Sequence, residues 1–384
     1  MPKPRLLVAT PYLPGRVHGH AADDLVFAYY GSLANHFDLH VVGPSTGNAA
    51  STPIPPGVTV HACRVAESSR ASVVGRYPWA LRHSWSKAMT RAALAVVDRV
   101  DPDHLHAEYL QPAELVMRAK RPFTITLHDL TAEFMRSKRA WSRTPQESVY
   151  RLIEQLRAER VESQVTRRAR GVFVLSEADQ QLLASSGVDS TVLRLGTTIP
   201  SSPWTLAESD PNQVCFMGAL WREPNQVAAR WLVERVMPKV WGSAPNAHLV
   251  IAGARPPRAM VEEFRDHPRV RIEADVPDPV HVYRASRVVM APTLAPAGIL
   301  LKAVSALALG APVVLNNASA AAFEPDMRAR MLVGESAEDF ARCVIDLLTD
   351  PQEARRAGEI GQAFIESRFS WSSYAREMSG VILR

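Results

Sequence analysis

Short apolar runs alternate with longer helical patterns along the whole chain. Apolar runs of this kind, bounded by turn-forming residues and separated by helical repeats, are typical of buried parallel strands joined by helices such as Asp23–His36 and Glu147–Arg168. The pattern therefore predicts an α/β protein with two doubly wound, Rossmann-like parallel sheets. The expected strands are Arg5–Thr10, Leu39–Val42, Val58–His61, Leu105–Ala107, Phe123–Leu127, Val172–Leu175, Val192–Leu195, Val214–Met217, His248–Ala252, Val270–Glu273, Val288–Met290 and Val313–Leu315.

A segment with few apolar residues, Gly196–Asn212, separates the two series of strands. It is rich in Pro, Ser and Thr, as interdomain linkers are. We therefore predict a first domain over residues 1–197, a linker over 198–212 and a second domain over 213–384, whose last helix can cross back to the first domain. Because ligands of parallel sheets bind beyond the carboxyl ends of the strands, two such domains imply a ligand cleft between them.

The stretch 288–315 predicts one strand–loop–helix–strand unit. The strand Val288–Met290 leads into the loop Pro292–Gly298, and a helical pattern follows over Ile299–Leu309. Gly310 is placed to end that helix, and Pro312 blocks its continuation. A helix N-terminus that follows a strand through a Gly-containing loop is a ready anion-binding site.

Lys302 lies near the start of this helix and shares one helical face with Gly298 and Ser305. A cation in the first turn opposes the helix dipole, and a bound phosphate would offset that cost. Alternatively, Lys302 is a surface lysine whose aliphatic stem covers apolar neighbours while its ammonium group reaches water. The local pattern leaves both interpretations open.

Other polar residues follow the predicted strands of the first half. His128 and Asp129 come directly after the strand PFTITL. A histidine there can act as an acid, a base or a hydrogen-bond donor to a substrate, although it can also cap the turn or pack in an interface. Ser176 is a good N-cap for the helix that follows it. Gly19 could bring backbone close to a phosphate, but its surroundings do not form a GxGxxG motif.

Two strand ends of the second half add candidates for nucleotide binding. Arg222, in the loop that begins at Gly218, is a second cation suited to a diphosphate. Backbone groups near Val276 could pair with a flat base. We therefore expect Arg222, Lys302 and Val276 to contact a nucleotide.

Composition and charge narrow the partners only slightly. The net charge of +5 suits anionic small molecules, an acidic membrane surface or nucleic acid, but no nucleic-acid-binding motif is present. Cations between Arg70 and Arg91 are interleaved with Tyr77, Trp79 and Trp85, and a second basic cluster spans 136–143. Such segments suit anionic lipid headgroups or a lipid-phosphate acceptor. Alternatively, they form a solvated helical face with the tryptophans turned inward.

Cysteine usage and hydropathy indicate where the protein resides. The three cysteines are far apart in the sequence, which argues against a zinc site and a disulfide framework and favours a reducing compartment. The apolar run at the N-terminus is too short for a signal peptide, and no apolar stretch is long enough to span a bilayer. We expect a cytoplasmic protein, with peripheral contact to the inner face of the membrane as an option.

Taken together, the order and spacing of several segments resemble glycosyltransferase family 4, whose members have the GT-B fold. The resemblance covers most of the chain. It implies two Rossmann-like domains, a nucleotide-diphosphate sugar as donor, and retention of anomeric configuration without a metal or other cofactor. The second domain would bind the donor and the first the acceptor. The segments are ITLHD, VFVLSEAD, VCFMGALWREPN, HLVIAG, YRASRVVMAP, GILLKAVSALALGAPVV and FSWSSYA.

Residue by residue, the resemblance implies roles for several of these positions. Gly298 and Lys302 match the first and fifth positions of the family pattern G-x-x-x-K-x-x-E, which implies contact with the donor diphosphate. His128 matches a frequent active-site histidine near the transferred sugar, and we expect His128 and Asp129 to be catalytic. Gly218 matches the glycine that begins the phosphate-side loop.

The chain departs from the family pattern at the donor site. Ser305 stands where the family has the glutamate that binds the ribose hydroxyls, and Arg222 only substitutes for an unaligned cation. A serine makes weaker hydrogen bonds to a ribose diol than a carboxylate does.

Three functions are therefore compatible with the sequence. The first is a retaining glycosyltransferase whose acceptor is a glycan, a lipid-linked intermediate or a small natural product. The second is a catalytically impaired homologue that acts as a partner protein, and the third is a GT-B sugar-nucleotide epimerase. No nucleic-acid partner is expected.

Overall fold

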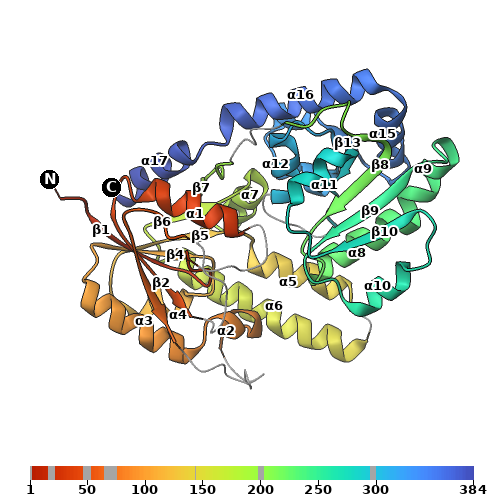
Figure 1. Cartoon of the computed structure of the whole chain (residues 1–384). Helices are drawn as coiled ribbons and strands as arrows, with labels where there is room; N and C mark the ends of the chain where they lie inside the picture. The colour runs from red at the N-terminus through yellow and green to blue at the C-terminus, as the bar shows by residue number, and fades with distance from the viewer. Residues whose placement is uncertain are drawn as a thin grey trace. The chain divides into compact units, whose positions relative to one another are not determined.

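The computed structural model describes residues 2–15, 22–45, 53–64, 76–142, 144–197, 203–294 and 300–384 (Figure 1). The chain divides into two compact units. The first unit contains Met1–Gly196 together with Ser370–Arg384, and the second contains Thr197–Phe369.

The first unit is built on a seven-stranded parallel sheet with the order β3-β2-β1-β4-β5-β6-β7. Its central strands β4 and β5 are buried along their whole length. Burial on both faces is expected for parallel strands covered by helices on each side. The strands are β1 (Arg5–Ala9), β2 (Asp38–Pro44), β3 (Val58–Cys63), β4 (His104–Glu108), β5 (Phe123–Leu127), β6 (Gly171–Val174) and β7 (Thr191–Val192).

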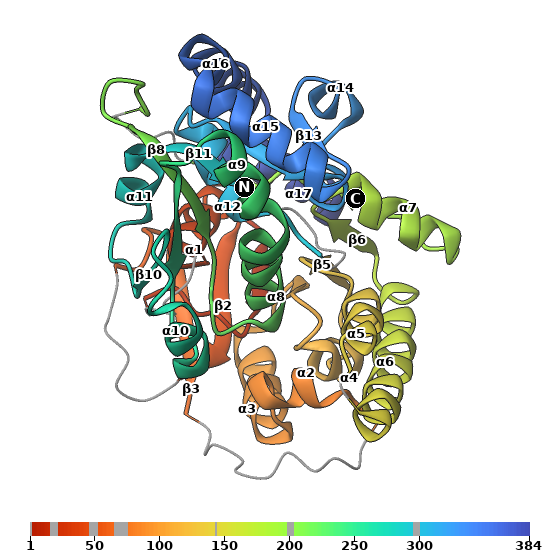
Figure 2. The ribbon, with the colours of Figure 1, turned by 90° about the vertical axis from the view of Figure 1, so that its right-hand side faces the viewer.

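Helices cover this sheet, and local caps define several of their starts. Ser86, Thr144 and Ser176 each accept a hydrogen bond from a first-turn N–H, so the N-cap predicted at Ser176 is confirmed. Figures 1 and 2 show α5 beside α6, and the last helix, α17, packs beside α1. The helices are α1 (Ala22–Leu33), α2 (Trp79–Ser84), α3 (Lys87–Val100), α4 (Ala113–Arg118), α5 (Thr131–Ala140), α6 (Pro145–Thr166), α7 (Glu177–Ser185) and α17 (Trp371–Ile382).

The second unit is built on a six-stranded parallel sheet with the order β10-β9-β8-β11-β12-β13. The strands are β8 (Asp210–Met217), β9 (His248–Gly253), β10 (Val270–Ala274), β11 (Ser286–Met290), β12 (Val313–Asn316) and β13 (Leu332–Gly334). The helices are α8 (Glu223–Trp231), the π-helix η1 (Leu232–Val236), α9 (Met237–Ser243), α10 (Arg258–Phe264), α11 (Pro279–Ala285), α12 (Leu301–Ala308), α13 (Asn317–Ala320), α14 (Pro325–Arg328), α15 (Ala337–Thr349) and α16 (Pro351–Arg368).

The predicted fold class is confirmed, because both units are parallel α/β sheets. In each, the direction of the strand order reverses between two neighbouring strands. These are β1 and β4 in the first unit and β8 and β11 in the second. Ligands of open parallel sheets bind beyond the carboxyl ends of such a strand pair. The two switch points therefore identify where functional side chains should gather.

Some predicted boundaries were wrong. β8 begins at Asp210, inside the segment predicted as linker, because its backbone pairs with β11 at Ser286 although its first residues are polar. The short strand β13 was missed because its three residues give no periodicity. Gly310, with φ of 82°, does end α12 as predicted.

Within the described part of the chain, no helix is both long and apolar enough to cross a lipid bilayer.

Candidate functional site

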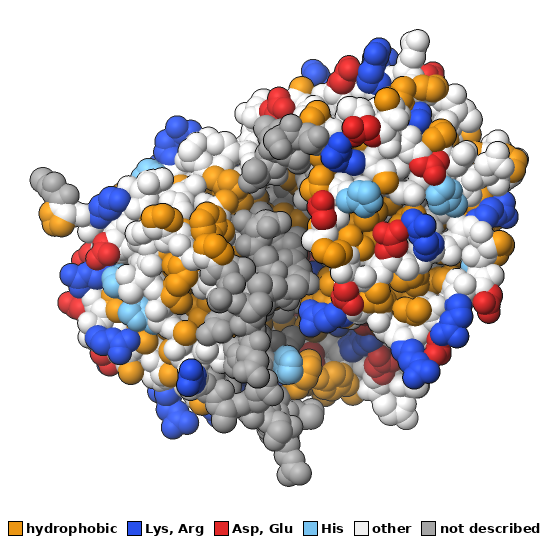
Figure 3. All heavy atoms as spheres, viewed as in Figure 1, with side chains coloured by type: hydrophobic (Ala, Val, Ile, Leu, Met, Phe, Trp, Pro, Cys, Tyr) orange, Lys and Arg blue, Asp and Glu red, His pale blue; other side chains and the backbone are white. Residues whose placement is uncertain are grey.

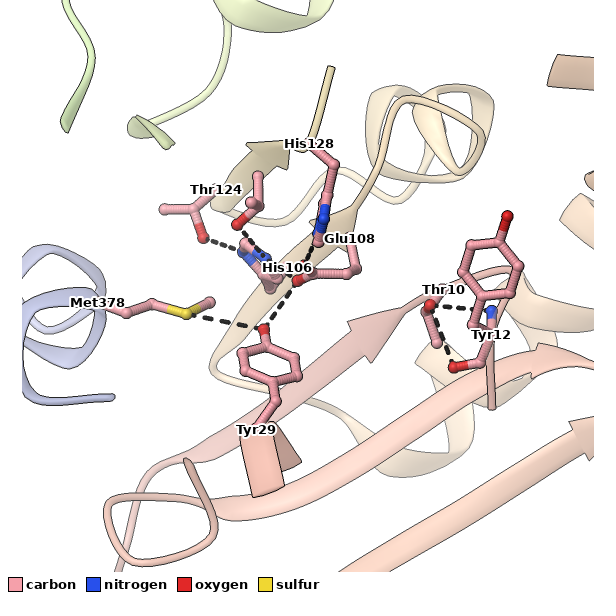
Figure 4. Close-up of polar contacts among 9 residues, drawn as sticks. Thr10, Tyr12, Tyr29, His106, Glu108, Thr124, His128 and Met378 are labelled. Atoms are coloured by element: carbon pink, nitrogen blue, oxygen red, sulfur yellow. Dashed lines mark hydrogen bonds and ion pairs between the residues drawn. The ribbon is translucent and has the colours of Figure 1, made fainter. Parts of the chain in front are cut away.

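At the switch point of the first unit, a carboxylate joins two histidines. His106 and Glu108 lie two residues apart on β4, so their side chains leave the same face of the strand. His106 Nε2 lies 2.9 Å from Glu108 Oε2, and His128, just after β5, contacts Glu108 Oε1 through its own Nε2 (Figure 4). His128 was predicted as a site residue, whereas Glu108 and His106 were not predicted as its partners.

The network is buried apart from His128. The His106 side chain is fully buried and that of Glu108 is 6% exposed, whereas the His128 side chain is 18% exposed. Thr124 Oγ1 lies 2.8 Å from His106 Nδ1, and Thr126 Oγ1 lies 3.1 Å from His106 Nε2. His128 is therefore the member of this network that can meet a substrate.

Glu108 is ionised in this setting. Burial alone would raise the pKa of the Glu108 carboxyl, but hydrogen bonds from His106 and His128 outweigh burial and lower the pKa to about 2. Tyr29 on α1 adds a third donor, because its hydroxyl lies 2.8 Å from Glu108 Oε2. Tyr29 also lies 3.7 Å from the sulfur of Met378 on α17, so the carboxylate is enclosed on this side.

Tyr109 holds the ring of His128 from one face. The two rings are stacked, with centroids 3.8 Å apart and planes 17° apart. Tyr109 has a positive φ of 72°, which is unusual for a bulky residue and costs about 1–3 kcal/mol. Its backbone N–H donates to Thr126 O at 2.9 Å, which ties the strained residue to the next strand.

Asp129 lies near Tyr109, because burial raises the pKa of the Tyr109 hydroxyl and the negative charge of Asp129 adds to the rise. Burial raises the pKa of Asp179 on α7 to about 6, and the nearby Asp129 carboxylate adds to the rise. Asp129 therefore lies close to Asp179, whereas the carboxylate that contacts His128 is Glu108.

In the second unit, Lys302 lies at the switch point on the first turn of α12. Its ammonium group donates to Asn225 Oδ1 at 3.1 Å and lies 4.2 Å from the centroid of the Phe216 ring, in the middle of the sheet. Lys302 is partly buried. Its Nζ is therefore held against β8 by an amide and an aromatic face.

Asn225, on the first turn of α8, was not among the predicted site residues. Its amide nitrogen donates to Ala219 O at 3.0 Å while its oxygen accepts from Lys302. A Cβ atom at Gly218 would lie 2.9 Å from the side-chain carbon of Asn225. Gly218 thus leaves the space that Asn225 occupies, and Asn225 orients Lys302.

A second cation lies near Lys302. Partial burial, together with the positive charge of Arg222, lowers the pKa of Lys302 to about 7. Arg222 is exposed and forms the N-cap position of α8. Two positive charges at one switch point favour binding of an anion.

The neighbouring strand ends are tightly packed. Gly253, at the end of β9, has φ of 148°, and a Cβ atom there would lie 1.7 Å from Gly218 O. Arg255 donates its backbone N–H to Asp275 Oδ1 at 2.7 Å, and its guanidinium lies 4.9 Å from the ring of exposed Trp221. Val276 follows Asp275 and is partly buried against the core of the second unit.

The structure adds little about three further residues that were predicted to lie in the site. Ser305 is exposed one turn after Lys302 on α12. Gly298 and Gly19 lie outside the described residues.

The basic and aromatic segment has both of the anticipated environments. Trp85 is buried, whereas Trp79 is 41% exposed and stacks on His83. In the second cluster, Arg136 pairs with Glu133 and Glu159. On the face drawn in Figure 3, acidic and basic side chains are mixed across the second unit, so its charges do not gather there into one patch.

Comparisons with known proteins match both units. Residues 28–196 match a family model described as "Glycosyl transferase 4-like domain", and residues 211–350 match one described as "Glycosyl transferases group 1". Together the two models cover most of the chain. No curated protein sequence gives a significant match.

Solved structures of similar fold extend over nearly the whole chain. Sucrose-phosphate synthase from Thermosynechococcus elongatus has a TM-score of 0.71 and 16% identity, covering 98% of each chain. HepE from Anabaena in complex with UDP-glucose has a TM-score of 0.66 and 12% identity, covering 98% of this chain and 99% of that one. The catalytic domain of starch synthase IV from Arabidopsis thaliana, bound to ADP and acarbose, has a TM-score of 0.66 and 12% identity, covering 100% and 99%.

Proposed function

Since the chain belongs to the group 1, family 4-like glycosyltransferases and has the GT-B fold, we propose that it moves a sugar from a nucleotide-diphosphate sugar to a hydroxyl-bearing acceptor with retention of configuration. HepE and starch synthase IV were solved with UDP-glucose and ADP, which supports a nucleotide-diphosphate donor.

The observation that carries the proposal is the setting of Lys302. Its ammonium group is partly buried, is oriented by the neutral amide of Asn225 and lies near a second cation, Arg222. A diphosphate would offset both positive charges and would accept hydrogen bonds from both side chains. Preorganised cations stabilise the negative charge that develops on a leaving diphosphate.

The bond changes follow from this assignment. The bond between the anomeric carbon and the diphosphate oxygen breaks, and a bond to the acceptor oxygen forms. Retention requires the acceptor to approach on the face from which the diphosphate leaves. The leaving phosphate oxygen is then close enough to take the proton of the acceptor hydroxyl.

His128 is assigned to the sugar. It is the partly exposed member of the Glu108 network, and the stacked Tyr109 ring fixes its plane. A fixed imidazole can orient a sugar hydroxyl by hydrogen bonding, which contributes to rate through positioning. Asp129, Gly218, Gly298, Gly19 and Val276 remain part of the proposed site, with Gly218 acting through Asn225.

The acceptor side suits a lipid-linked substrate at an anionic membrane. Val149, Ile153 and Leu156 on α6 are 58%, 42% and 54% exposed and form one stripe, because their spacing is four and three residues. Arg160 continues the stripe one turn later and is exposed. An apolar stripe with a basic end fits the interface of a membrane that contains acidic lipids.

A turnover assay tests the proposed function. The full chain would be incubated with a panel of UDP-, GDP-, ADP- and dTDP-sugars and membrane lipid extracts, with release of nucleoside diphosphate as the readout. We expect release from one donor, and its loss in His128→Ala but not in His83→Ala, which changes an exposed histidine of the same unit.

Other outcomes of the assay support the rival functions. Donor binding without transfer would support a partner protein. Conversion of the donor without any acceptor would support an epimerase.

A further inference from the structure

The carboxylate of Glu108 receives hydrogen bonds from three side chains of the first unit. Oε1 is contacted by His128 Nε2, and Oε2 lies 2.9 Å from His106 Nε2 and 2.8 Å from the Tyr29 hydroxyl. An ionised carboxylate can only accept hydrogen bonds, so each of these three groups must donate. In both histidines, therefore, the proton lies on Nε2.

This arrangement leaves a defined atom of His128 for a ligand. With Nε2 engaged by Glu108, the other ring nitrogen, Nδ1, makes no hydrogen bond to the described part of the chain and is the nitrogen left for a ligand. In the neutral ring, a proton on Nε2 makes Nδ1 an acceptor. The stacked Tyr109 ring, 3.8 Å away, resists rotation that would exchange the two nitrogens.

We propose that Glu108 is a positioning residue that fixes His128 as its Nε2–H tautomer and thereby makes Nδ1 a hydrogen-bond acceptor for the substrate. The inference rests on the proposed function, because it assumes that His128 meets the sugar. It adds a requirement on the substrate class: the group that meets Nδ1 must be a donor, such as a free sugar hydroxyl or an amide N–H.

The rest of the network supports a role that is directed at His128. His106 is fully buried between Glu108 and Thr124, and Tyr29 is enclosed by Met378 and by the ring of Tyr374, whose centroid lies 5.4 Å away. His106 and Tyr29 therefore hold the carboxylate in place, and its second oxygen is left for His128. The strained backbone of Tyr109 places its ring against His128, which is consistent with a site that orients the His128 side chain.

Nitrogen-15 NMR of the full chain labelled at histidine tests the tautomer directly. At a pH at which His128 is neutral, we expect its Nε2 signal to be that of a protonated nitrogen and its Nδ1 signal that of an unprotonated one. His128→Gln assigns the signals. The opposite pattern in the wild-type protein would overturn the proposal without any need for a Glu108 variant.

Variants of Glu108 test its control over His128. In Glu108→Gln, an amide oxygen and an amide NH₂ group replace the two carboxylate oxygens. The three donors then compete for one acceptor oxygen, and His128 should become a mixture of its two neutral tautomers. Turnover should fall roughly tenfold, as expected for one misplaced hydrogen bond. Glu114→Gln, which removes the charge that pairs with Arg118, is the matched control and should change neither the His128 tautomer nor the turnover.

The two readouts separate this inference from the proposed function. Slower turnover of Glu108→Gln with an unchanged His128 tautomer would show that Glu108 has only a structural role, and would refute its positioning role. The expected tautomer shift, combined with full activity of His128→Ala, would keep the positioning role but refute the assignment of His128 to the sugar.

Discussion

The ammonium group of Lys302 should make nucleotide binding depend on pH. Its pKa of about 7 in the free protein reflects partial burial and the nearby Arg222. A bound diphosphate favours the protonated form and raises this pKa again, so binding above pH 7 must take up a proton. Calorimetry in buffers of different ionisation enthalpy should show proton uptake and an affinity that falls between about pH 7 and about pH 9. The same affinity across that range would contradict a contact between Lys302 and the diphosphate.

The same lysine should reduce the stability of the free protein. Because its pKa is about 7 when folded and 10.5 ordinarily, the unfolded chain binds more protons between these values, and stability is lost as the pH falls through this window. Lys302→Met should therefore raise the free energy of unfolding at pH 7 by about 1 kcal/mol, which urea unfolding would show as a higher midpoint. The gain should shrink as the pH approaches 10.5. A less stable variant at pH 7 would show that Lys302 is a favourable structural contact instead.

Ser305 offers a gain-of-function test of the donor site. The sequence pattern predicts that Ser305 stands where the family has a glutamate that binds the ribose hydroxyls, and a carboxylate bonds more strongly than a hydroxyl. Ser305→Glu should tighten binding of the donor nucleotide about tenfold, the equivalent of one charge-assisted hydrogen bond. Ser243→Glu, which changes an exposed serine on α9, controls for added negative charge. Equal affinities in both variants would mean that the ribose lies elsewhere.

Single residues at strand ends could be found from the sequence, but their partners could not. His128 and Lys302 follow recognisable strands, so their positions are set by the local pattern. Glu108 lies 20 residues before His128, and Asn225 lies 77 residues before Lys302. Those pairs meet only because β4 lies beside β5 and β8 beside β11. Local periodicity does not specify which atoms of neighbouring strands touch.

At the scale of elements, the close approach of β8 and β9 depends on one glycine. Gly253 combines a φ of 148° with a position where a Cβ atom would overlap Gly218 O. Gly253→Ala should destabilise the second unit by about 3 kcal/mol or more, because backbone strain and overlap add. At Gly242 an added Cβ atom would meet no atom within 4 Å, so Gly242→Ala should change stability little. Urea unfolding of the two variants compares them, and similar midpoints would refute the need for glycine at the strand end.

Long elements were predictable, whereas short or polar ones were not. Phe123–Leu127 was predicted to the residue because an apolar run lies between turn-forming residues. β13 has only three residues, and the start of β8 is polar, so both depend on pairing with a neighbour. The π-helix η1 within the helical stretch after β8 also leaves no distinct pattern in the sequence.

At the scale of the whole molecule, the α6 stripe should bring the enzyme to acidic membranes. The protein should float with phosphatidylcholine vesicles only when they contain phosphatidylglycerol, because Arg160 adds electrostatic attraction to apolar insertion. Changing Val149, Ile153 and Leu156 to glutamate should abolish flotation. Leu182→Glu, at an exposed leucine on α7, is the control. Unchanged flotation of the triple variant would exclude this stripe as the docking surface.

The most direct test of a nucleotide-diphosphate donor bound through Lys302 is calorimetric titration of the full chain with UDP, GDP, ADP and dTDP. Wild-type protein should bind one of them, and Lys302→Met should weaken that binding by a factor of ten or more, the equivalent of a lost charge-assisted hydrogen bond. Lys239→Met, which removes a lysine paired with Glu338 in the same unit, should bind as the wild type does. Equal binding by all three proteins would contradict the assignment of Lys302 to the diphosphate. No binding by well-folded wild-type protein would contradict the donor class itself.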